Sequence, residues 1–106
     1  MPVFGDKQAR ARRRLAALGP AIEKDRKRLA VAEEQVLFLT QVESDARTDA
    51  VVAEDLGMAR EHTASQRDLQ RAVRDRDEIR EALAARRAQQ DRLLEELLDS
   101  GDAPLD

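Results

Sequence analysis

The only histidine of this sequence and the acidic residues near it are the side chains best suited to metal binding or acid–base chemistry. His62 lies close in sequence to Glu54, Asp55 and Glu61. A divalent-metal site would need several of these side chains to converge on one ion, and a general base would need a pocket and an oriented nucleophile such as Ser65. A lone histidine among acids is more typical of a solvated surface. We therefore expect no metal site, no cofactor and no enzymatic activity.

Glycine-rich phosphate-binding loops would be another source of chemistry, and the sequence contains none. Gly19-Pro20 and Gly57 are isolated and match no nucleotide-binding fingerprint. They are typical of helix punctuation, since Gly favours the position after a helix and Pro the first turn of the next helix. We therefore expect no small-molecule substrate, and we predict a helix break at Gly19-Pro20.

A basic segment near the N-terminus gives the strongest signal for an anionic partner. Between Lys7 and Arg28 there are nine cationic and two anionic side chains. Such a helix can neutralise phosphates and release counterions. However, the net charge is −3 and the chain has only two aromatic residues on which bases could stack. Non-specific nucleic-acid binding, as by a nucleoid-associated protein, is therefore the alternative function. The cations concerned are Lys7, Arg10, Arg12, Arg13, Arg14, Lys24, Arg26, Lys27 and Arg28.

Membrane contact is not favoured by the same segment. Residues 7–18 contain only Leu15 and Leu18 as large apolar groups, whereas an amphipathic membrane helix has a broad, bulky apolar face. The sequence also has no apolar run of about 18 residues and no apolar core of a secretory signal. The expected location is the cytoplasm.

The composition predicts an all-α fold. The chain of 106 residues is 42% hydrophobic and 39% charged, with two aromatic residues and no cysteine. This bias is typical of long helices and coiled coils, and it argues against a β-sandwich or barrel. The length fits one domain.

Two stretches carry apolar residues at heptad spacing, which predicts two helices that pack along their length. The first stripe consists of Leu15, Leu18, Ile22, Leu29, Ala32, Val36, Leu39 and Ala46. The second consists of Leu69, Ala72, Ile79, Leu83, Leu93 and Leu97.

An antiparallel hairpin explains the charged residues that interrupt these stripes. Pairing Leu18 with Leu97 in the hairpin also brings Arg86 within reach of Asp25. The same register brings Arg76 within reach of Glu43, so that the polar interruptions become opposite-charge neighbours. It centres the turn on Gly57-Met58.

This register predicts three regions along the chain. They are a basic lead and short helix at 1–19, a helical hairpin at 20–99 with its turn near 55–62, and a disordered acidic tail at 100–106. For residues 44–66 the sequence leaves three structures open, namely one turn, a short extra helix or uninterrupted helix. Ser44, Thr48 and the segment Thr63–Gln66 are candidate helix caps.

The apolar face widens at one place, beyond what a two-helix seam needs. Because a two-helix hairpin buries little apolar surface, we expect this widening to bind a second copy or another helical protein. The predicted function is therefore a coiled-coil interaction or scaffold protein that self-associates. The partner-binding residues are Val36, Leu37, Phe38, Leu39 and Val42.

Overall fold

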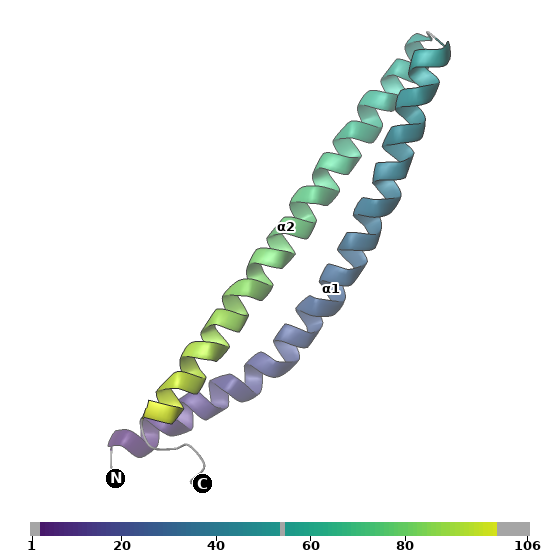
Figure 1. Ribbon diagram of the computed structural model, residues 1–106. Helices are drawn as coiled ribbons and strands as arrows, with labels where there is room; N and C mark the ends of the chain where they lie inside the picture. The colour runs from purple at the N-terminus through teal and green to yellow at the C-terminus, as the bar shows by residue number, and fades with distance from the viewer. Residues whose placement is uncertain (1–2, 54, 100–106) are drawn as a thin grey trace. The chain divides into compact units, whose positions relative to one another are not determined.

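The chain folds as an all-α antiparallel hairpin of two long helices, as its composition and heptads predict (Figure 1). The computed structural model describes residues 3–53 and 55–99. Helix α1 spans Val3–Ala53 and helix α2 spans Leu56–Asp99. Within these ranges there is no strand. The predicted acidic tail at 100–106 lies outside the described residues.

The hairpin divides into two packed units, each containing a segment of both helices. Unit 1 comprises Met1–Arg26 with Glu81–Asp106, and unit 2 comprises Lys27–Arg80. Unit 2 contains the connection between the helices, and unit 1 contains most of the predicted basic segment.

The predicted break at Gly19-Pro20 is wrong, because α1 continues through both residues. Pro20 donates no amide hydrogen bond to the carbonyl four residues earlier, which costs about 3 kcal/mol in a helix interior. Packing on both sides offsets this cost, since Leu18 is buried against Leu93 and Ile22 packs against the same cluster. The basic N-terminal segment is thus the first part of α1 and not a separate short helix.

The core of unit 1 joins both predicted stripes. Ala11, Leu18 and Leu93 are buried together, and Leu15, Ile22 and Leu97 pack against them. Leu18 therefore shares this cluster with Leu93 and with Leu97, the partner that the sequence predicts. Fully burying a leucine contributes about 1.5–3 kcal/mol, so this cluster is the main apolar contact of unit 1.

The core of unit 2 is thinner. Among the residues that the structure describes there, Ala32 and Ala72 are the buried apolar side chains. The larger seam residues are only half-buried, and they include Val36, Leu39, Val42, Leu69 and Ile79. Because alanine buries little apolar area, unit 2 gains less from its own packing than unit 1.

The connection between the helices lies earlier than predicted. Residues 56–62, which make up much of the predicted turn, are already helical. Asp55 caps α2: its Oδ1 accepts a hydrogen bond from the Gly57 amide at 2.8 Å, and its carbonyl accepts one from the Ala59 amide at 3.0 Å.

The other candidate caps lie inside the helices. The Thr48 hydroxyl donates to the Ser44 carbonyl at 3.1 Å, and the Thr63 hydroxyl donates to the Ala59 carbonyl at the same distance. Bonding one turn back is the usual solution for a hydroxyl within a helix. Among the described residues of 44–66, α1 ends at Ala53, α2 begins at Leu56, and there is no separate short helix.

Candidate interaction surfaces

The predicted partner-binding segment splits between two faces of α1. Val36, Leu39 and Val42 are half-buried and belong to the seam of the hairpin. Leu37 and Phe38 are 71% and 67% exposed. Successive residues turn by about 100° around a helix axis, so five neighbouring apolar residues cannot all face one partner. Only Leu37 and Phe38 are fully available to a second molecule.

Val31 extends this exposed surface and is absent from the set that the sequence predicts. It is 65% exposed and lies seven residues before Phe38, which places both on about the same side of α1. That spacing is the signal that could have identified it. We call Val31, Leu37 and Phe38 the central apolar patch; all three belong to unit 2.

Charged residues flank the central apolar patch in a fixed order along α1. Lys27 and Arg28 precede Val31, whereas Asp45 follows Phe38, and all three are exposed. The Asp45 carboxylate accepts a hydrogen bond from Gln41 Nε2 at 2.9 Å, which orients it along the helix surface. The patch therefore has a cationic flank at one end and an anionic flank at the other.

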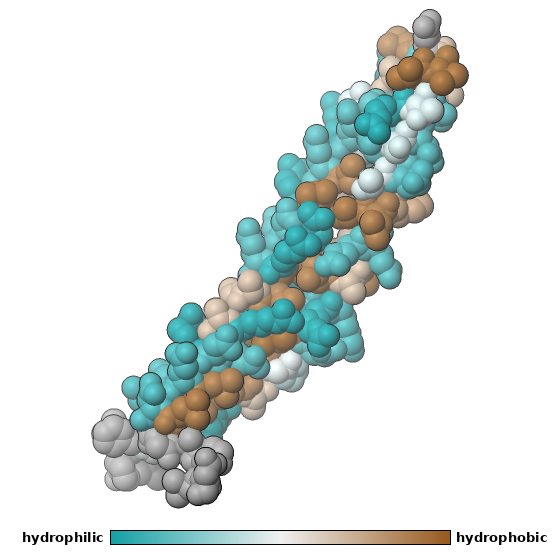
Figure 2. Space-filling model, in the orientation of Figure 1, coloured by the Kyte–Doolittle hydropathy of each residue, from teal (hydrophilic) through white to brown (hydrophobic). Residues whose placement is uncertain are grey.

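A second exposed apolar surface lies where the two helices are joined. Val51 and Val52 lie in the last turn of α1 and Leu56 begins α2, and all three are largely exposed. Figure 2 shows apolar surface at this end of unit 2. Leu56 also lines a shallow groove that includes Arg60 and Arg67. The sequence did not predict this surface because the predicted turn lies later in the chain.

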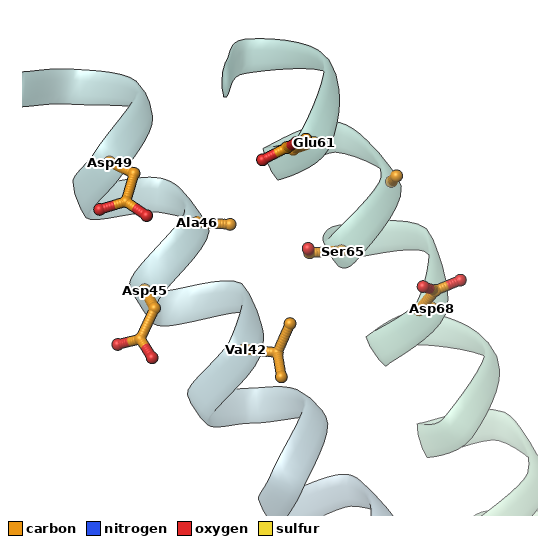
Figure 3. Close-up of a pocket in the computed structure, with 8 residues that line it drawn as sticks. Val42, Asp45, Ala46, Asp49, Glu61, Ser65 and Asp68 are labelled. Atoms are coloured by element: carbon orange, nitrogen blue, oxygen red, sulfur yellow. The ribbon is translucent and has the colours of Figure 1, made fainter. Parts of the chain in front are cut away.

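An acidic groove lies beside this end of the hairpin. Its volume is about 450 Å³, and its walls include Asp45, Asp49, Glu61 and Asp68. Figure 3 shows Val42, Ala46 and Ser65 pointing between the helices, whereas the Asp45 carboxylate lies on the side of α1 away from α2. Among residues 3–53 and 55–99, no three acidic or histidine side chains converge on one point that could hold a metal ion.

His62 is not the solvated residue that the sequence predicts. Its Nε2 lies 2.9 Å from Glu43 Oε1, and the two side chains are only 20% and 14% exposed. Because α2 begins at Leu56, His62 already lies within the helix, seven residues before Leu69 of the second stripe. That spacing places it on the face towards α1, where it pairs with Glu43.

Asp25 carries the charge that is most deeply buried among the described residues. It is 1% exposed, and its Oδ2 accepts a hydrogen bond from Arg86 Nη1 at 2.5 Å. The same Arg86 nitrogen also lies 3.4 Å from the Ala21 carbonyl oxygen. This contact confirms the predicted Asp25–Arg86 pair. The predicted Glu43–Arg76 pair is wrong, because Glu43 contacts His62 and Arg76 forms an ion pair with Asp77.

The nine cations of the predicted nucleic-acid surface are all exposed. Some of them already have anionic neighbours, since Arg26 Nη1 lies 3.3 Å from Glu23 Oε2. In unit 1, Lys7, Arg10 and Arg14 line a groove of about 220 Å³ together with Glu96. An external phosphate at this groove would therefore meet three cations and one carboxylate.

Comparisons with known proteins identified no relative of this chain. Searches of family models, of curated proteins and of solved structures found no match for this chain. Neither helix, over the residues that the structure describes, has a stretch apolar enough to cross a membrane.

Proposed function

We propose that this chain is a non-enzymatic helical interaction protein that self-associates through the central apolar patch. The observation that carries this proposal is the exposure of Leu37 and Phe38, at 71% and 67%, in the middle of a long helix. Large apolar side chains that are exposed together typically mark an interaction site. The alanine-based core of unit 2 gives a second reason, because association would add the burial that this unit lacks.

The apolar area that a dimer would cover supports the same proposal. Covering the exposed part of Leu37 and Phe38, which are 71% and 67% exposed, on both copies of a symmetric dimer would contribute roughly 4–8 kcal/mol. Since association itself costs about 4–15 kcal/mol, we expect a dimer whose population depends on protein concentration.

The test is a pair of double variants, compared by light scattering after size-exclusion chromatography. Leu37→Gln with Phe38→Gln should shift the mass towards 11.9 kDa while the circular dichroism of the helices is retained. Val51→Gln with Val52→Gln is the matched control, because it removes two equally exposed apolar residues outside the patch. Equal association of the Leu37/Phe38 variant and the unmodified chain would contradict the proposal.

Nucleic-acid binding is the second candidate function, and the exposure of all nine cations between Lys7 and Arg28 favours it. We expect binding to duplex DNA that weakens steeply with salt and shows little sequence preference. Replacing Arg10, Arg12, Arg13 and Arg14 with glutamine should abolish it. The measurement is fluorescence anisotropy of a labelled duplex, and no binding at low salt would eliminate this function.

We also propose that the self-association takes place in the cytoplasm, with a second copy or another helical protein as partner. The highly charged composition of the chain, 39% Asp, Glu, Lys and Arg, supports this location. Fractionation of cells that express a tagged chain tests it, and recovery of the chain outside the cytoplasmic fraction would contradict it.

A further inference from the structure

We infer that the second copy docks in the antiparallel orientation, with α1 of one copy running against α1 of the other. The inference rests on the proposed self-association and adds its geometry. It places Lys27 of each copy beside Asp45 of the other copy, with the central apolar patches covering one another between these two ionic contacts.

The order of residues on the outer face of α1 supports this orientation. Val31, Phe38 and Asp45 follow one another at seven-residue spacing, and Lys27 lies one turn before Val31. The outer face thus changes along the helix from cationic to apolar to anionic. All of these residues belong to unit 2 and lie on one continuous segment of α1.

Charge complementarity distinguishes the two orientations. A parallel dimer in register would place Lys27 beside Lys27 and Asp45 beside Asp45, and both contacts are repulsive. An antiparallel dimer converts both into attractive pairs. The residue halfway between Lys27 and Asp45 is Val36, next to Leu37 and Phe38, so one two-fold axis can bring the apolar patches and both ionic pairs together. Such a closed two-fold contact is the commonest form of homodimer.

Glu34 does not select between the orientations. It is exposed and lies between Val31 and Phe38, close to the centre of the patch. In an antiparallel dimer whose axis lies at the level of Val36, Glu34 of one copy lies level with Phe38 of the other, whereas in a parallel dimer it lies level with Glu34 of the other copy. Its carboxylate therefore disturbs the apolar contact in one orientation and repels its own copy in the other, and the choice of orientation rests on Lys27 and Asp45.

Charge-reversal variants test the ionic contacts. In the antiparallel dimer, Lys27→Glu alone and Asp45→Lys alone each replace two attractive pairs with repulsive ones. Each should lower the association constant by roughly 3- to 20-fold at low salt, and the effect should shrink as salt rises. The double variant Lys27→Glu/Asp45→Lys should restore the association of the unmodified chain. In a parallel dimer, each single variant would associate as tightly as the unmodified chain, which would overturn the inference.

Disulfide cross-linking gives an independent measurement of orientation, because the chain contains no cysteine of its own. Ala30 and Gln41 are exposed and lie at similar distances on either side of the centre of the patch. Ala30→Cys and Gln41→Cys are prepared as two proteins of distinguishable mass and oxidised separately and together. The exposed Ala88 of unit 1, replaced with cysteine, gives the collisional background.

The antiparallel dimer predicts that the mixed product, in which the Ala30→Cys protein is linked to the Gln41→Cys protein, dominates and that each protein alone gives only background. Efficient cross-linking of each protein to its own copy would overturn the inference in favour of a parallel dimer. A dimeric mass without any cross-link above background would overturn the inference, because the interface would then lie on another face. The proposed self-association would still hold. A monomeric mass at every concentration would instead contradict the proposed function itself.

Discussion

At the residue scale, the two polar pairs between the helices have different origins in the sequence. Asp25 and Arg86 each interrupt an apolar stripe. An antiparallel register that pairs the two charged residues accounts for both interruptions. The predicted pair could therefore be identified without the structure, and it is confirmed. The His62–Glu43 pair could not, because its prediction needs the exact helix end. A turn placed near 55–62 leaves His62 outside the helix that actually positions it.

Loss of the Asp25 carboxylate should destabilise unit 1. Asp25→Ala removes the buried acceptor of Arg86, whose side chain is 41% exposed and can turn to water, so we expect the free energy of unfolding to fall by about 1–2 kcal/mol, as measured by urea denaturation. Replacing both residues with leucine should recover much of this loss, because an apolar pair needs no desolvated charge. A change below about 0.5 kcal/mol for Asp25→Ala would contradict the structural role of the pair.

Loss of the His62 ring should destabilise unit 2 to a smaller extent. His62→Ala leaves the partly buried Glu43 carboxylate without its partner, and we expect a loss of about 1–2 kcal/mol by urea denaturation. Glu61→Ala is the matched control, since Glu61 is exposed next to His62 in sequence and should change stability by less than about 0.5 kcal/mol. Equal effects of the two substitutions would argue against the pair.

At the element scale, α1 shows how tertiary packing overrides local sequence signals. Gly19-Pro20 is a strong helix-stop signal, and yet the helix continues through it. The stop signal is local, whereas the burial of Leu18 against Leu93 depends on a residue far along the chain. The heptad stripes predicted the two helices. They did not predict where α2 begins, because that point is set by the Asp55 cap.

Removing the proline should stabilise the hairpin. Pro20→Ala restores a backbone donor inside α1, and we expect up to about 3 kcal/mol of added stability in thermal or urea unfolding. Gly19→Ala should add about 0.5–1 kcal/mol, because a Cβ at this position has no neighbouring atom within 4 Å. Destabilisation by Pro20→Ala would contradict this expectation and show that α1 depends on the backbone conformation that proline imposes at this position.

At the scale of the whole molecule, the fold class was more predictable than the interaction surface. Composition and heptad spacing are averaged over many residues, so they predicted an all-α hairpin despite errors at the turn. The interaction surface depends on which residues the second helix covers. That covering removed Val36, Leu39 and Val42 from the predicted set. The exposed positions added Val31 to Leu37 and Phe38, a residue that its seven-residue spacing from Phe38 could have indicated.

Sedimentation equilibrium of the unmodified chain, over concentrations from low micromolar to submillimolar, tests the central claim most directly. Self-association through the central apolar patch predicts an average mass that rises with concentration from 11.9 kDa towards twice that value. Because the proposed contact is a closed dimer, the mass should then reach a plateau. A mass that stays at 11.9 kDa over the whole range would contradict self-association.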